Sequence, residues 1–199
     1  MSGFRRLTFC FLLLSCTLHS EGMDRAPMPR DPLAGEVGST VPSFQMRTVS
    51  GPMMNRSVCH VCRNGERPVV MVVLRDLGSS QRVLLRNIDR VVERERTRGL
   101  RSFAVFLSDL PRRDISRVQT FTFNGRVGMP LGLAPDAIGT DQLGVSDQNR
   151  VSVILYSNQT VFKRYDFGEA GPTHDEIREI LAGTEELLAD SERVTSDQP

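Results

Sequence analysis

Apolar positions along the chain alternate between two spacings, one typical of buried strands and one typical of amphipathic helices. The six consecutive apolar residues 69–74 predict a strand covered on both faces of a sheet. A helix is predicted after this strand from apolar residues at helical spacing, which are Val83, Leu84, Ile88, Val91 and Val92. We expect Ser79 or Ser80 to cap the start of this helix, and Gly99 to stand just beyond its end. Its other face, which carries Arg82, Arg86, Arg90, Glu93 and Arg94, is expected to face solvent.

The rest of the chain continues the alternation of strands and helices. Further strands are predicted at 44–49, 102–107, 129–133, 151–156 and 160–167, the last two forming an antiparallel hairpin. The segment 109–123 is predicted to be helical, although its end at 120–123 also fits a strand. A last helix begins at the capping box of Thr173 and Glu176 and has an apolar stripe of Ile177, Ile180, Leu181 and Leu188. This order predicts an α/β fold, with a mixed central sheet and helices on both faces.

The two ends of the chain differ in character from the predicted domain. Arg5 and Arg6 precede a short apolar stretch, so residues 1–22 are interpreted as a signal peptide. Cleavage of the signal peptide after the small residues near Gly22 is favoured. Lipidation of Cys16 at a weak lipobox is the alternative. Residues 23–37 are interpreted as a linker, 38–189 as one domain and 190–199 as a disordered tail. The sequence therefore predicts an extracytoplasmic protein, periplasmic or secreted, with a lipid anchor as an alternative.

Composition excludes some classes of partner. The chain has 199 residues, of which 39% are hydrophobic and 25% charged, as in a globular protein. Lys and Arg number 25 against 24 Asp and Glu, and the charges are scattered, so nucleic acid is not expected as a partner. After the leader, no segment has the length of a membrane-spanning helix.

Two cysteines precede the apolar run at 69–74. Cys59 and Cys62 have the Cys-x-x-Cys spacing that lets one thiolate attack a disulfide while the other cysteine resolves the product. In an oxidising compartment such a pair is expected to rest as a disulfide. Arg56, Arg63 and Arg67 flank it, and positive charge stabilises a thiolate.

The order of elements resembles the thioredoxin superfamily over residues 38–189. The opening GSTVPSF at 38–44 is similar to the entry of peroxiredoxins and of exported thioredoxin-like oxidoreductases, and the chain also ends with a hairpin and a helix. The resemblance implies a three-layer α/β/α fold of thioredoxin type and a possible redox activity.

The cysteine pair departs from the pattern of that family. Thioredoxins place the pair after the central strand, but here the segment 75–80 holds no cysteine and the pair precedes the strand. The family's cis-proline before the hairpin is also missing, because 144–150 contains no proline. The standard active site is therefore expected to be absent, with the pair in a loop beside the central strand.

Other chemistry has weaker support from the sequence. A structural zinc site needs four ligands, and beyond the cysteines the predicted domain offers only His60 and His174, so no metal is expected. Haem attachment is excluded, because Arg63 rather than histidine follows Cys62. Five aspartates are interpreted as caps or turn residues, and these are Asp109, Asp114, Asp136, Asp141 and Asp147. No cofactor is expected.

Two functions remain open. One is thiol-disulfide exchange with a protein or a small thiol, in which Cys59 would attack and Cys62 would resolve. The other is a redox-inactive thioredoxin-like binding or scaffold protein, in which the Cys59–Cys62 disulfide is structural. The short loop limits the stabilisation by such a disulfide to about 2 kcal/mol.

Overall fold

The computed structural model describes residues 35–196 and contains a single seven-stranded sheet. The predicted signal peptide, Cys16 and nearly all of the predicted linker lie outside these residues, as do the last three positions. The strands are β1 (Met46–Ser50), β2 (Ser57–Val58), β3 (Val69–Leu74), β4 (Arg101–Leu107), β5 (Leu131–Ala134), β6 (Val151–Ser157) and β7 (Thr160–Phe167). Their order across the sheet is β2-β1-β5-β4-β3-β6-β7.

The sheet is mixed, as the sequence predicts. β4 pairs in parallel with both β3 and β5. β6 pairs antiparallel with β3, and β7 pairs antiparallel with β6. The hairpin of β1 and β2 extends the sheet on the β5 side, also by antiparallel pairing. All six residues of β3 are buried because this strand is central and covered on both faces.

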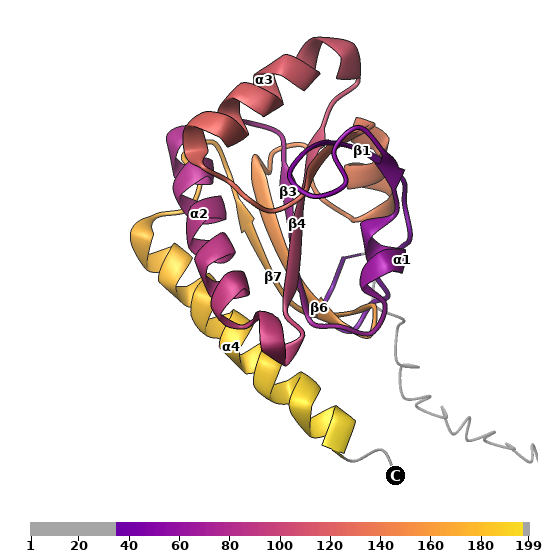
Figure 1. Cartoon of the computed structure of the whole chain (residues 1–199), viewed down its shortest axis with the longest axis vertical. Coiled ribbons are helices and arrows are strands. Elements are labelled where there is room, and N and C mark those ends of the chain that lie inside the picture. The colour runs from indigo at the N-terminus through magenta and orange to yellow at the C-terminus, as the bar shows by residue number, and fades with distance from the viewer. Residues whose placement is uncertain (1–34, 197–199) are drawn as a thin grey trace, which may run out of the picture. The chain divides into compact units, whose positions relative to one another are not determined.

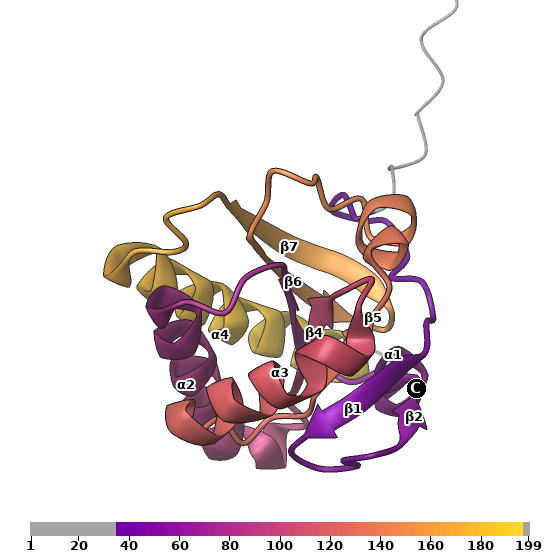
Figure 2. The same cartoon turned by 90° about the horizontal axis from the view of Figure 1, so that it is seen from above.

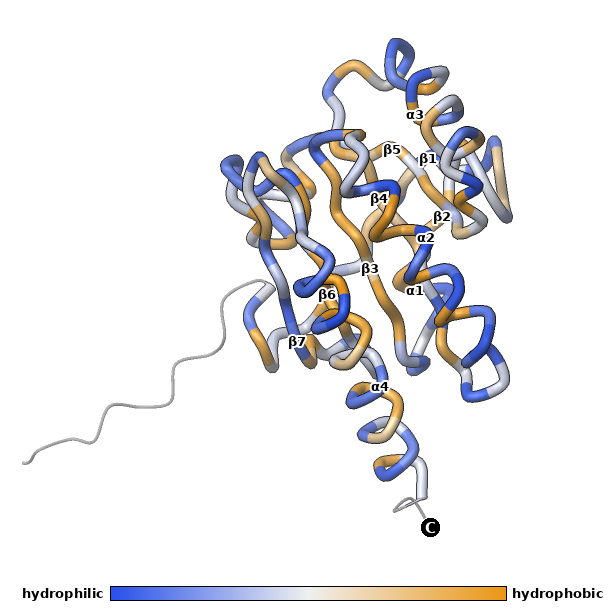
Figure 3. The backbone as a smooth tube through the Cα atoms, turned by 90° about the vertical axis from the view of Figure 1, so that its left-hand side faces the viewer, coloured by the Kyte–Doolittle hydropathy of each residue, from blue (hydrophilic) through white to orange (hydrophobic). Residues whose placement is uncertain are grey.

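One face of the sheet is covered by the three long helices, α2 (Ser79–Arg94), α3 (Pro111–Gly125) and α4 (His174–Ser196) (Figures 1 and 2). Two successive parallel crossovers in the same direction put α2 and α3 on the same face, because such crossovers are right-handed. The opposite face is covered by the short α1 (His60–Asn64), the π-helical turn η2 (Ile138–Gln142) and the segment 39–45. The sheet thus lies between two hydrophobic cores, and Figure 3 shows its central strands as the most continuously apolar part of the chain.

Helix boundaries refine several predictions. α2 begins at Ser79 behind Gly78, which makes no side-chain cap, so neither predicted serine is the N-cap. α2 ends at Arg94 and is followed by the 3₁₀ turn η1 (Arg96–Arg98), which Gly99 closes with a φ of 91°. α3 runs through 120–123 as a helix, so the alternative of a strand there was wrong. At its end, Phe121 is buried but Phe123 is 83% exposed.

The last helix shows one prediction confirmed and one corrected. The capping box is present, because the Glu176 N–H donates to Thr173 Oγ1 at 3.3 Å and the Thr173 N–H donates to Glu176 Oε2 at 2.7 Å. α4 then continues to Ser196, although the sequence predicts a disordered tail from residue 190. No helix among residues 35–196 combines the length and the apolar character needed to cross a membrane.

Candidate functional site

The cysteine pair lies at the junction of β2 and α1. β2 is held against β1 through the pairs of Ser57 with Arg47 and Val58 with Met46. Cys59 follows directly as the N-cap residue of α1, with φ −87° and ψ 99°. The expectation that the pair lies in a loop was therefore wrong, because one turn of helix includes Cys62. A helix of five residues is too short to leave a periodic pattern in the sequence.

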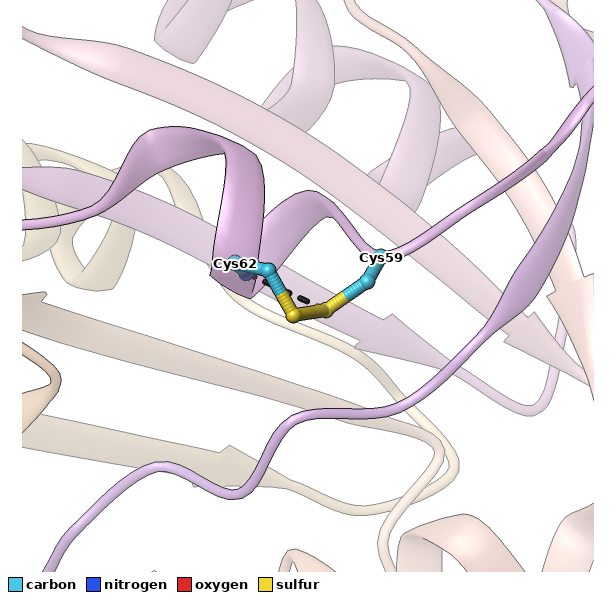
Figure 4. Close-up of a disulfide and its surroundings, with 2 residues drawn as sticks. All are labelled: Cys59 and Cys62. Atoms are coloured by element: carbon cyan, nitrogen blue, oxygen red, sulfur yellow. Dashed lines mark hydrogen bonds between the residues drawn. A yellow bond between two sulfur atoms is a disulfide. The ribbon is translucent and has the colours of Figure 1, made fainter.

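Cys59 and Cys62 form a disulfide, with their Cα atoms 5.4 Å apart (Figure 4). The backbone N–H of Cys62 donates to Cys59 Sγ at 3.1 Å. Cys62 is exposed, whereas Cys59 is half-buried and packs against the core on the α1 face of the sheet. Cys59 Sγ is therefore the sulfur of the pair that accepts a backbone N–H.

His60 has a structural position between the two cysteines. Its ring is 5% exposed, stacks on Phe103 with ring centroids 5.2 Å apart, and places Nε2 3.1 Å from Thr48 Oγ1. Burial, together with the positive charge of Arg63, lowers the pKa of His60 to about 4. The imidazole is therefore neutral at neutral pH and helps to hold α1 against the sheet.

The charge near the disulfide is positive. Arg56, Arg63 and Arg67 are exposed, and Arg63 lies in the last turn of α1, one residue after Cys62. The lowered pKa of His60 has the charge of Arg63 as one of its causes, so this charge acts on its immediate surroundings. Such an environment favours thiolates and attracts anionic thiols. Among residues 35–196, no three His, Cys, Asp or Glu side chains gather as a metal site would require.

The position where thioredoxins carry their cysteines, at the carboxyl end of the central strand, is occupied by an ion pair. Arg75 follows β3, and its side chain is 8% exposed. It pairs with Asp136 and donates to the carbonyl oxygen of Val145 at 3.3 Å. Asp136 is thus more than the turn residue that the sequence suggested. The part of the chain that the structure describes also contains no cis peptide bond.

Two other carboxylates behave differently from each other. Asp114 lies in the first turn of α3 and accepts from Ser108 Oγ at 2.5 Å, so it is neither the cap nor the solvated turn residue that the sequence predicts. Asp89, which the sequence interpretation did not single out, accepts the backbone N–H groups of Gly128 and Met129 at 2.6 and 3.0 Å. Burial raises the pKa of Asp89 despite these hydrogen bonds. Its partners come from a distant loop, so no local sequence signal marks it.

Comparison with known proteins identifies the type of fold. No protein-family model matches this chain, and no curated protein matches it significantly. Solved structures do match. A Bacteroides thetaiotaomicron protein assigned as a protein disulfide isomerase is 13% identical, with a TM-score of 0.62 over 80% of this chain and 94% of that one. A Chlorobium tepidum protein assigned as the thiol:disulfide interchange protein DsbE is 12% identical, with a TM-score of 0.61 over 77% and 98%.

A third structure with a similar fold is Mycobacterium tuberculosis AhpC. It is 12% identical and matches with a TM-score of 0.58 over 79% of this chain and 95% of that one. Likeness at such low identity establishes the fold and nothing further. The predicted thioredoxin-like fold is therefore confirmed, and it carries a Cys59–Cys62 disulfide at a position different from the family's usual one.

Proposed function

We propose that this protein is a thiol-disulfide oxidoreductase that acts through Cys59 and Cys62. The observation that carries the proposal is the partly exposed Cys59–Cys62 disulfide, in which Cys59 Sγ also accepts the N–H of Cys62. The solved structures of similar fold include proteins assigned to disulfide chemistry, which agrees with this assignment. The proposed partners are a protein disulfide or a small thiol outside the cytoplasm, in keeping with the predicted leader.

In the reduced protein, the Cys59 thiolate attacks one sulfur of a substrate disulfide. A mixed disulfide forms, and the other substrate sulfur leaves as a thiolate. Cys62 then loses its proton and attacks Cys59 Sγ, which restores the Cys59–Cys62 disulfide and releases the second substrate thiolate. The hydrogen bond from Cys62 N–H stabilises the charge on Cys59, so Cys59 is the proposed attacking residue.

The reduction potential of the disulfide tests the proposal. The folded protein is equilibrated in graded glutathione buffers, its free thiols are alkylated, and the mass shift is read at each potential. We expect a midpoint at or above about −270 mV, in the range of known oxidoreductases. A midpoint below about −300 mV, or reduction only after unfolding, would instead mark a structural disulfide.

The roles of the two cysteines are tested with single variants. Cys62→Ser keeps the backbone N–H that donates to Cys59, so Cys59 is expected to form a lasting mixed disulfide with glutathione disulfide. Cys59→Ser is the matched control, and its Cys62 is expected to react more slowly, because the hydrogen bond from the Cys62 N–H is made to residue 59 and not to Cys62 Sγ. The rates are measured across pH by mass spectrometry. Faster reaction of Cys62 at low pH would reverse the two roles, since Cys62 is the more exposed cysteine.

A redox-inactive binding or scaffold protein is the second candidate function. The observation that favours it is the ion pair of Arg75 and Asp136, which occupies the family's usual redox position. The half-buried position of Cys59 against the core also fits a structural disulfide that holds α1 next to β2. Under this alternative, neither cysteine variant loses any exchange activity, because none exists in the parent protein.

A further inference from the structure

A cleft of about 560 Å³ opens near the amino ends of β4 and β5, away from Arg75 at the carboxyl end of β3. The residues that line it come from the loop between β1 and β2, from α1 and the segment after it, from α2 with η1, from the start of β4, and from the loop between α3 and β5. We call it the arginine cleft, after the arginines along its wall: Arg63, Arg67, Arg90, Arg96, Arg101 and Arg126. Its volume lies within the usual range of small-molecule sites, about 300–1,000 Å³.

Acidic residues of the cleft do not balance this charge. Asp89 and Glu93 are its only carboxylates, which leaves a formal excess of four positive charges. Asp89 is engaged by the backbone N–H groups of Gly128 and Met129, and Glu93 pairs with Arg96 at 3.2 Å. These two carboxylates therefore leave most of the positive charge of the cleft unneutralised.

Several of the arginines have no acidic partner. Within residues 35–196, no ion pair is formed by these four: Arg63, Arg67, Arg90 and Arg126. Arg101 is half-buried and donates only to the carbonyl oxygens of Leu100 and Arg96, at 2.7 and 3.1 Å. Burial and the nearby charges of Arg67 and Arg96 lower the pKa of Arg101, which reflects mutual repulsion of these guanidinium groups. An anion in the cleft would relieve that repulsion.

We infer that the arginine cleft binds a small polyanion with at least two phosphoryl or carboxylate groups. Guanidinium groups bind both kinds of group by paired, charge-assisted hydrogen bonds. Because the arginines come from separate segments, an anion with several charged groups can contact more of them than a single phosphate can. This inference does not depend on the thiol chemistry proposed for Cys59 and Cys62.

Binding is tested by titration calorimetry on the purified, disulfide-bonded protein at a constant ionic strength of about 0.15 M, where screening is strong. The probes are orthophosphate, tripolyphosphate and citrate. We expect saturable binding of tripolyphosphate or citrate, at least about tenfold tighter than orthophosphate, since each added charge-assisted contact contributes about that factor. Preference between the two identifies phosphoryl or carboxylate groups as the ligand chemistry.

Matched variants separate the cleft from general positive charge. Arg67→Gln and Arg90→Gln together are expected to weaken binding by at least about tenfold, because two unpaired guanidinium groups are lost from the wall. Arg86→Gln, an exposed arginine of α2 outside the cleft, is the control and should change affinity less than about twofold. Thermal unfolding establishes that all three proteins fold alike.

Two results would overturn the inference: no saturable binding of either polyanion, or equal losses of affinity in the cleft and control variants.

Discussion

At the scale of single residues, His60 couples stability to pH. Its pKa is about 4 in the folded protein and about 6.5 in an unfolded chain. Between these values the unfolded state binds more protons, so the stability contributed by neutral His60 is complete above about pH 6.5 and is lost as pH falls toward 4. The loss is at most about 3.4 kcal/mol, because the two pKa values differ by about 2.5 and 1.36 kcal/mol accompanies each pKa unit.

The measurement is urea unfolding at several pH values between 4 and 7. His60→Gln is expected to unfold with a weaker pH dependence over this range than the parent, since its side chain does not titrate. His174→Gln, which replaces an exposed histidine, serves as the control. Identical slopes for the parent and His60→Gln would contradict the assignment of a neutral, buried His60.

Residue chemistry was foreseeable where its partners are close in the sequence. The spacing of Cys59 and Cys62 predicted a pair that the structure joins as a disulfide. The environment of His60 was not foreseeable, because Thr48 and Phe103 reach it from two other strands. The charged face of α2 was expected to be solvated, but Arg82 packs over the ring of Phe121, at 5.5 Å from its centroid.

At the scale of elements, contacts with η1 explain why α4 extends beyond its predicted end. Arg98 donates to both carboxylate oxygens of Glu192, at 2.7 and 3.0 Å, and to Glu185 at 3.3 Å. Two turns of α4 are thereby tied to a turn that follows α2. The polar composition after residue 190 gave no sign of this, because composition does not record which distant side chain binds the segment. α1 was missed for another reason, since one helical turn carries no periodicity.

Removal of these ion pairs should loosen the end of α4 and leave the core intact. Arg98→Gln is expected to speed amide hydrogen exchange over 185–196, because those amides then open locally without the tether to η1. Exchange in β3 should not change. Arg178→Gln, whose parent side chain pairs only with Asp175 within α4 itself, is the control. Equal exchange of 185–196 in both variants would show that packing alone orders this end.

At the scale of the whole molecule, the order of predicted elements indicated the fold, but it did not indicate where the surface clefts lie. Strand and helix patterns between residues 38 and 189 predicted the mixed sheet, and seven strands with two flanking cores are observed. The arginine cleft escaped prediction because its wall assembles only when α1, α2, β4 and the loop before β5 come together. Fold follows from patterns within segments, whereas such a cleft depends on contacts between them.

The position of the disulfide outside the two hydrophobic cores predicts how the stability of the protein responds to its reduction. The cores on both faces are built from β3, β4 and the helices, while the disulfide closes a four-residue segment beside the edge strand β2. We expect reduction to lower the free energy of unfolding by about 2 kcal/mol or less, because so short a loop restricts the unfolded chain little. Urea unfolding with and without reductant measures the change, and the double variant Cys59→Ser with Cys62→Ser should match the reduced parent. A fold that survives reduction is what repeated exchange requires. Unfolding on reduction would instead assign the disulfide the role of a staple and favour the redox-inactive alternative.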